Sequence, residues 1–272
     1  AYEIPEAGRT AKGTPAVNFL SLLQRERINA IIPIKEFSEE KYLIGVTKHG
    51  TIKKTALSNF DTNRKAGLIA INLKDGDELV GIKQTSGTDN VIIVTKHGKC
   101  ICFSENDVRP MGRIAGGVRA IKLEKDDEVV AMQLVQPKEQ LLVVTKKGFG
   151  KRTAAKEYKV QVRGGKGLLT YDKSKFKKTG ELIGAMVVDD EDEVLLINSN
   201  GIIIRIKAGD VSKLGRATQG VKIMKVSEDT EIISMAKVIK EEDVTSDKKE
   251  NGMEKADHGQ LSMETLGEEK KK

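Results

Sequence analysis

The sequence predicts an all-β fold in which a unit of about fifty residues repeats to build a propeller-like array of four-stranded blades. A basic, glycine-containing loop recurs along the chain, and a tight turn closed by glycine recurs between apolar runs. The apolar runs are short, and none has the length or the periodicity of a core helix. One such unit cannot bury its own apolar faces, so neighbouring units must stack against each other.

The recurring loop, called the box below, sets the period of the repeat. Its fullest copy is residues 161–167, with the sequence QVRGGKG. The box arginines are Arg9, Arg64, Arg113, Arg163 and Arg216. Successive box arginines lie 55, 49, 50 and 53 residues apart, and a nearly constant spacing of this length indicates a repeat architecture.

A unit read from one box to the next contains four apolar runs separated by turns rich in Asp, Gly, Ser and Thr. In the unit after Arg64 the predicted strands are 67–73, 78–82, 91–95 and 99–103. The second strand has five copies, at 27–30, 78–81, 128–131, 181–184 and 231–234. The hairpin turn has four copies, at 47–50, 95–98, 145–148 and 198–201. Each hairpin turn is closed by a glycine, which supplies the positive φ that a tight turn requires.

The boxes divide the chain into predicted units. Complete repeats are predicted at 8–60, 61–109, 110–160 and 161–213, followed by a partial repeat at 214–240. On this pattern a hairpin would precede residue 1, so we expect the chain to be the C-terminal part of a longer protein. Residues 241–272 contain 10 acids and 6 bases and few large apolar side chains, which predicts a charged, disordered tail.

The charge of the chain is unevenly distributed. The net charge is +7, and because the tail carries −4, residues 1–240 carry +11. A basic body favours a polyanion as its partner. Aromatic residues make up 4% of the chain and Trp is absent, so few side chains are available to stack on the bases of a single strand. The expected partner is therefore the backbone of a duplex, with little direct base readout.

The chemistry of the box suits phosphate. Glycines let backbone amides approach an anion, and Arg and Lys bind phosphate oxygens. The box is not a P-loop, because the spacing differs and a strand rather than a helix follows it. The alternative is a turn that links two units, with the arginine paired to a neighbouring acid. The predicted DNA-binding residues are Arg9, Lys12, Lys53, Lys54, Arg64, Lys65, Lys99, Arg113, Arg119, Lys151, Arg152, Gln161, Arg163, Gly164, Gly165, Lys166, Gly167, Arg205, Lys207, Arg216 and Lys222.

The repetition also argues against catalytic and metal centres. His49 and His97 occupy a turn position that holds Lys147 and Asn200 in the other copies, so this position requires a polar residue rather than an imidazole. Acidic runs at 75–78, 126–128 and 189–192 lack the pattern of a calcium loop and are predicted to form turns between strands. No catalytic residue and no metal ligand is predicted.

The two cysteines, Cys100 and Cys102, lie two residues apart in an apolar run. In a strand they point to the same face. With no second cluster of Cys or His, they are interpreted as buried strand residues of a protein in a reducing compartment. No apolar run is long enough for a transmembrane helix, so a membrane partner is not expected.

The order of these motifs resembles the C-terminal domain of the bacterial DNA gyrase A subunit. The resemblance is carried by residues 2–13, 50–55, 148–153 and 215–221 and extends over about residues 1–240. It implies a six-bladed β-pinwheel, which is a propeller-like ring whose blades exchange strands. It also implies that the rim wraps duplex DNA, so that the ATP-dependent holoenzyme introduces negative supercoils.

The resemblance implies further properties of the protein. Residues 1–240 would be the DNA-wrapping domain, and the catalytic tyrosine would lie in another part of the full protein, so this chain would be non-catalytic. The chain itself would bind no cofactor, whereas the holoenzyme would use ATP and Mg²⁺. Its partners would be double-stranded DNA and, in the holoenzyme, the gyrase B subunit, together with a second A subunit. The isolated domain would be monomeric. The location would be the bacterial cytoplasm, at the nucleoid.

One departure concerns the box that defines this family, Q-[R/K]-R-G-G-[R/K]-G, which belongs to the first blade and is missing here. Residues 161–167 are the nearest match, with Val162 where a second basic residue is expected. Two alternatives remain open. One is the C-terminal domain of the topoisomerase IV A subunit, although residues 2–13 favour gyrase. The other is a propeller that binds proteins as a scaffold, which would need an apolar patch on its rim or top face.

Overall fold

A computed structural model describes residues 5–8, 10–20, 22, 26–62, 64 and 67–238. The chain divides into two units, Ala1–Lys237 and Val238–Lys272, and the fold below is that of the first. The tail predicted at 241–272 lies outside the described residues. No helix in the described ranges is long and apolar enough to span a membrane.

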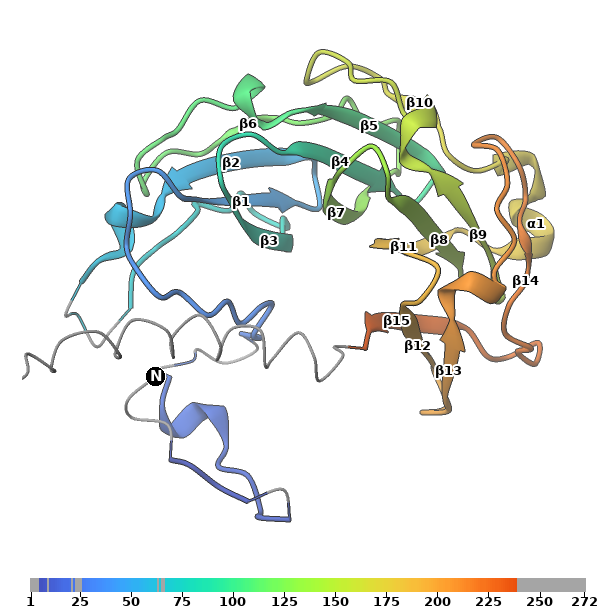
Figure 1. The fold of residues 1–272 in the computed structure, drawn as a ribbon, viewed down its shortest axis with the longest axis horizontal. Coiled ribbons are helices and arrows are strands. Elements are labelled where there is room, and N and C mark those ends of the chain that lie inside the picture. Colours follow the sequence, from blue (N-terminus) through green and yellow to red (C-terminus); the bar gives the residue numbers. More distant parts are fainter. Residues whose placement is uncertain are drawn as a thin grey trace, which may run out of the picture. The chain divides into compact units, whose positions relative to one another are not determined.

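The prediction of an all-β fold is confirmed. Figure 1 shows the sheets in chain order, from the blue strands β1 and β2 to the orange strands β12 and β13. Within the described ranges the one α-helix is α1 (Phe176–Thr179). Single 3-10 turns occur at Ala16–Asn18, Leu57–Phe60, Glu105–Asp107, Ala155–Glu157, Lys173–Lys175 and Ala208–Asp210.

The described strands form four antiparallel sheets. The first has the order β3-β1-β2-β6 and contains β1 (Tyr42–Thr47), β2 (Thr51–Ala56), β3 (Leu79–Thr85) and β6 (Val118–Arg119). The second has the order β10-β5-β4-β7 and contains β4 (Asn90–Thr95), β5 (Lys99–Ser104), β7 (Val129–Val135) and β10 (Leu168–Leu169). The third has the order β11-β8-β9-β14 and contains β8 (Gln140–Thr145), β9 (Phe149–Ala154), β11 (Leu182–Val188) and β14 (Val221–Lys222). The fourth has the order β13-β12-β15 and contains β12 (Glu193–Asn198), β13 (Ile203–Lys207) and β15 (Ile232–Lys237).

Each sheet is built on one predicted hairpin and completed by strands from later in the chain. In the first sheet the hairpin is β1–β2, with Val46 opposite Ile52 around the turn at Gly50. The inner strand β3 follows the next box, and the outer strand β6 follows the box after that. The expectation that one box-to-box unit makes one sheet is wrong, because strands from two later units cover the two edges of each of the first three hairpins, and the fourth hairpin gains one later strand, β15.

Two runs predicted to be strands, 27–30 and 67–73, have no strand structure. By their place in the repeat, they would be the inner and outer strands of a sheet whose hairpin precedes β1. No such hairpin occurs among the described residues, and neither run joins a sheet there. Several of their apolar side chains are therefore exposed, with Ile28 45% and Ile69 62% exposed.

The core lies between successive sheets. Strands β4 and β8 are buried along almost their whole length, because a sheet packs on each of their two faces. Since successive residues of a strand point to opposite faces, Val91 and Ile93 pack with residues of the first sheet. Ile92 and Val94 pack instead with residues of the third sheet, including Leu141. Stacking of neighbours thus buries faces that a single sheet would leave in water, as the repeat predicts.

Candidate nucleic-acid interface

Three boxes end on a glycine that lies against the second strand of a hairpin. Gly117, Gly167 and Gly220 have φ values of 81°, 69° and 79°. A Cβ atom at any of them would lie within 2.7 Å of a carbonyl oxygen of that strand. Only glycine therefore fits, for reasons of both conformation and space. The two residues after each glycine form the outer strands β6, β10 and β14.

Hydrogen bonds join these boxes to one another in a row. The amide of Gly164 donates to Ala120 O at 2.8 Å, and the amide of Lys122 donates to Gly165 O at 2.8 Å. The amide of Asp172 donates to Thr218 O at 3.3 Å, which joins the next pair of boxes. Residues 113–122, 163–172 and 216–222 thus form one connected edge, called the box rim below.

The box rim carries exposed cations. Arg119, Lys166 and Lys222 are exposed, as predicted, and so is Lys122, which the sequence analysis missed. The signal for Lys122 in the sequence is that a second basic residue follows Arg119 of the outer strand after three positions. A groove of about 500 Å³ runs along the first part of the rim and is lined by Lys74, Arg119 and Lys122. Phosphate contacts need cations that are accessible in this way.

Four predicted DNA-binding residues are buried, and the expectation that they lie on an exposed rim is wrong. Two of them are lysines that donate hydrogen bonds to the backbone of the box loops. Lys53, 3% exposed, donates from Nζ to Ala70 O at 2.8 Å and to Arg113 O. Lys151, fully buried, donates to Gly215 O at 2.5 Å, to Thr218 Oγ1 at 3.1 Å and to Arg216 O. Each lysine therefore positions a box loop rather than contacting a phosphate.

The other two buried cations stabilise the sheets. Lys54 pairs with Glu105, with 2.9 Å between Nζ and Oε2, and their side chains are 3% and 0% exposed. Arg152 donates to Val211 O and Gly209 O, each at 2.8 Å, and pairs with Asp190. The repeat contains a signal for this burial. The positions of Lys53 and Lys54 correspond to Ile101 and Cys102 in the next hairpin, which are residue types found in cores.

Arg163, half-buried, uses its guanidinium within the protein. It donates from Nε to Asp107 O at 3.1 Å and from Nη1 to Arg119 O. The hairpin beside this box has Ile101 where the hairpins of Lys53 and Lys151 have a lysine, so Arg163 fastens its own loop. Arg113 and Arg216 are half-buried, and Arg216 donates from Nη1 to Leu169 O at 3.4 Å. Whether any box arginine touches phosphate stays a prediction.

The remaining predicted residues lie in the fullest box, on β5 and in the two earlier boxes. In the fullest box, the amide of Gln161 donates to Cys102 O at 2.8 Å, and Gly164 has a φ of 82°. Lys99 pairs with Glu124 at 2.7 Å, and the hydrogen bonds from Lys99 and Lys173 lower the pKa of Glu124 to about 2. Lys12 and Arg64 are exposed in earlier boxes, whereas Arg9 and Lys65 lie outside the described residues.

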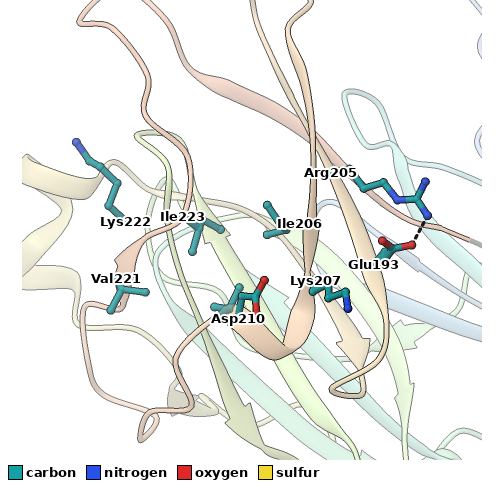
Figure 2. Close-up of a pocket in the computed structure, with 9 residues that line it drawn as sticks. Glu193, Arg205, Ile206, Lys207, Asp210, Val221, Lys222 and Ile223 are labelled. Atoms are coloured by element: carbon teal, nitrogen blue, oxygen red, sulfur yellow. Dashed lines mark hydrogen bonds and ion pairs between the residues drawn. The ribbon is translucent and has the colours of Figure 1, made fainter.

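Arg205 and Lys207 lie away from the rim, on β13. They line a groove of about 520 Å³ whose other side is formed by Val221, Lys222 and Ile223 of the last box. Figure 2 shows Arg205 paired with Glu193 across the β12–β13 ladder, while Lys222 points out on the far side. The cations of β13 and those of the rim thus face one groove.

The lysines of the hairpin turns are neutralised by acids. Glu128 pairs with Lys48 at 3.3 Å and with Lys96 at 3.6 Å. Glu181 pairs with Lys96 at 3.7 Å and with Lys146 at 3.8 Å, so the pairs form a row from sheet to sheet. The acids of this row therefore offset the charge of Lys48, Lys96 and Lys146.

The predictions for the histidines and the acidic turns are confirmed in the described ranges. The amides of His49 and His97 each donate at 2.9 Å to the buried carboxylates of Asp77 and Asp127 respectively. Those acids therefore cap turns, as expected of Asp between strands. Cys100 and Cys102 lie in one core cluster, and burial raises the pKa of their thiols to about 12 and about 11. Among the described residues, no three His, Cys, Asp or Glu side chains could together hold a metal ion.

Lys151 makes the stability of the protein depend on pH. Burial, its largest influence, lowers the pKa of Lys151 to about 8, whereas an unfolded lysine has a pKa of about 10.4. Between these values the unfolded chain binds a proton that the folded protein has released, so stability rises with pH. We therefore expect the free energy of unfolding of the parent, measured relative to that of Lys151→Met, to increase as the pH rises from about 8 to about 10.

Urea denaturation at successive pH values measures this trend. Lys207→Met, which removes an exposed lysine, is the matched control and should give a constant difference from the parent. A constant difference for Lys151→Met as well would contradict the lowered pKa of Lys151.

The fold and the rim define a class of protein, a propeller-like repeat protein with a cationic edge made of glycine-containing loops. A family model described as "DNA gyrase C-terminal domain, beta-propeller" matches residues 1–35, 41–86, 89–136, 139–189 and 192–239. The chain therefore belongs to the DNA gyrase C-terminal domain family. From residue 41 onward, each matched block begins at a hairpin.

Relatives and solved structures agree with this membership. The chain is 57% identical over 242 residues to the DNA gyrase A subunit of Clostridium acetobutylicum, covering 89% of this chain and 29% of that protein. It is 42% identical over 237 residues to the DNA gyrase A subunit of Salmonella typhimurium, covering 87% of this chain and 27% of that protein. The chain thus spans less than a third of the length of these relatives.

Two solved structures share the fold. The C-terminal domain of DNA topoisomerase IV superposes with a TM-score of 0.86 at 28% identity, covering 92% of this chain and 79% of that one. The DNA gyrase A C-terminal domain superposes with a TM-score of 0.75 at 30% identity, covering 84% of this chain and 76% of that one.

Proposed function

We propose that this chain is the DNA-wrapping domain of a gyrase A subunit. The observation that supports the proposal is the box rim, in which three boxes are hydrogen-bonded into one edge with Arg119, Lys166 and Lys222 exposed. The rim binds duplex DNA through its phosphates, without reading bases. Bending a site of 20–30 bp by 40–90° costs on the order of 1–6 kcal/mol, and phosphate contacts along a rim offset that cost.

In the full protein this domain would supply the wrap while other parts perform the chemistry. The type II topoisomerase would form when the full protein joins a second copy of itself and the gyrase B subunit. ATP and Mg²⁺ would bind outside this chain, which contributes no catalytic tyrosine of its own. The domain would act in the bacterial cytoplasm.

A topology assay tests the wrap. The purified chain is incubated with relaxed circular plasmid and a nicking-closing topoisomerase, and the deproteinised DNA is run on a gel. We expect a ladder of supercoils of one sign that grows with protein concentration. Wrapping with a fixed handedness constrains supercoils, and the topoisomerase relaxes the compensating ones and so changes the linking number. DNA binding without any change of topology would contradict wrapping. No binding at low salt would contradict the DNA-binding function altogether.

One observation supports a second candidate, the C-terminal domain of a topoisomerase IV A subunit. The solved topoisomerase IV domain superposes with a higher TM-score than the gyrase A domain, 0.86 against 0.75. Gyrase A remains the better proposal because the relative that is 57% identical is a gyrase A subunit.

A further inference from the structure

The middle of the repeat array exposes its large apolar side chains at the boxes. Within residues 79–198, which the structure describes without a gap, the exposed large apolar side chains are those of Ile114, Val160, Val162 and Leu169. All four lie in a box or within two residues of one. The other exposed large apolar side chains of the described residues occur before residue 79 or after residue 198. Single exposed apolar residues are normal on a protein surface, but here they gather on the rim that carries the cations.

Ile114 and Val162 are the most exposed of the four, at 81% and 83%. Both are held by loops with fixed backbones. The carbonyl of Ile114 accepts a hydrogen bond from Asn72 Nδ2 at 2.7 Å. The residue before Val162 is Gln161, whose amide donates to Cys102 O. Because the loops are already ordered, a partner that covers these side chains pays little conformational entropy.

Leu169 shows that apolar and cationic side chains share one line of the rim. It pairs with Lys99, the residue that follows a hairpin glycine. In the neighbouring sheets, Arg119 and Lys222 pair with the equivalent residues of their hairpins. Since position in the ladder decides the face to which a strand residue points, Leu169 occupies the place that a cation has in the other two sheets.

The two most exposed side chains also lie beside cations. A Cβ atom on Gly165 would lie 3.6 Å from the carbonyl oxygen of Val162, so the loop turns back on itself between Val162 and Lys166. Gly116, two residues after Ile114, lines the cationic groove of the rim. The rim is therefore a surface on which aliphatic and cationic side chains alternate.

Such a mixed surface fits the DNA backbone better than it fits a protein. Lysine is depleted at surfaces that bind proteins. In DNA each phosphate lies between two deoxyribose sugars, and the C2′ methylene group of each sugar is apolar. A cation that binds a phosphate therefore brings a neighbouring aliphatic side chain within reach of a sugar.

We propose that Ile114, Val162 and Leu169 pack against deoxyribose sugars of the duplex, an inference that rests on the DNA-wrapping function proposed above. The contact adds an apolar contribution to the affinity that is independent of salt, because it releases no counterion. It also favours DNA over RNA, because the 2′-hydroxyl of ribose would set a polar group against these side chains. Phosphate contacts alone would not distinguish the two sugars.

Salt titration of a double variant, Ile114→Thr with Val162→Thr, tests the contact. Threonine keeps the branched shape of these side chains and introduces a hydroxyl. With duplex DNA and fluorescence anisotropy, we expect binding about tenfold weaker at every salt concentration, with an unchanged slope of log K against log salt. The matched control is Ile31→Thr with Ile233→Thr, because these side chains are 87% and 59% exposed and lie outside the rim. The control should bind DNA as the parent does.

An RNA duplex of the same sequence tests the assignment to the sugar. The parent and the rim double variant should bind RNA with equal affinity, so the preference of the variant for DNA should be about tenfold smaller than that of the parent. The different shape of an RNA helix affects both proteins alike and cancels in this comparison. Urea denaturation should show that both double variants are as stable as the parent, because the altered side chains are exposed.

The outcomes separate this inference from the function on which it rests. A rim double variant that binds DNA as tightly as the parent would overturn the sugar contact and leave wrapping by phosphate contacts intact. Equal losses on DNA and RNA would overturn the assignment to deoxyribose, and a reduced salt slope would show that the variant had lost phosphate contacts instead. Failure of the parent itself to bind DNA at low salt would contradict the proposed function.

Discussion

Replacing Lys54 by methionine is expected to lower the free energy of unfolding by about 3–5 kcal/mol, because it removes one partner of a buried ion pair. The carboxylate of Glu105 is fully buried and would lose the ammonium that lies 2.9 Å away. The hydrogen bonds it accepts from Thr85 Oγ1 and from the amide of Asp89 would remain. These two bonds do not neutralise its charge. Urea denaturation followed by circular dichroism measures the loss.

Two variants test the explanation. Lys207→Met removes an exposed lysine and should change the free energy of unfolding by no more than about 0.5 kcal/mol. Lys54→Met combined with Glu105→Leu removes both charges and should recover much of the lost stability, because no unpaired ion is left buried. The DNA affinity of folded Lys54→Met should equal that of the parent. A variant of normal stability with weakened DNA binding would instead restore Lys54 as a phosphate contact.

Replacing the exposed rim cations Arg119, Lys166 and Lys222 together by glutamine is expected to weaken DNA binding for all sequences alike. Each lost phosphate contact reduces the slope of log K against log salt by about 0.9, so the slope should fall by about 3. Fluorescence anisotropy with duplexes of different sequence, titrated at several salt concentrations, measures both effects. The free energy of unfolding should change little, because the three side chains are exposed.

A second triple variant is the matched control. Lys41, Lys138 and Lys147 are exposed lysines outside the rim, and their replacement by glutamine removes the same amount of charge. If both triple variants reduce the salt slope equally, then net charge rather than the rim binds DNA. If only the rim variant reduces it, the rim is the binding surface.

The features predicted correctly from the sequence depend on local chemistry. The hairpins follow from a glycine at each turn, and the box glycines from a backbone conformation that other residues avoid. The repeat pattern alone could not predict the grouping of strands into sheets, because each sheet combines segments far apart in the chain, such as β2 with β6. The exchange of strands between blades was expected only from the family resemblance. Sequence periodicity gives the length of the repeat and not the position at which one sheet ends.

The candidate site was predicted less well, for a physical reason. Lysines were assigned to the surface because an ammonium normally stays in water. Lys53 and Lys151 are buried because carbonyl oxygens at Arg113 and Arg216, some sixty residues later in the sequence, satisfy their ammonium groups. No local pattern shows these partners. Comparison of Lys53 with Ile101 in the next hairpin is the signal that reveals the burial.

The exchange of strands has a consequence for how such a protein can evolve. In an ordinary tandem array, one repeat can be inserted or deleted and its neighbours keep their own strands. Here the first sheet takes β3 and β6 from the two following repeats, and the next two sheets do the same with later ones. Loss of one repeat from the middle would therefore leave two other sheets to be completed by strands from the wrong repeats. A change in the number of blades has to begin at an end of the array, where fewer sheets depend on the strand that is gained or lost.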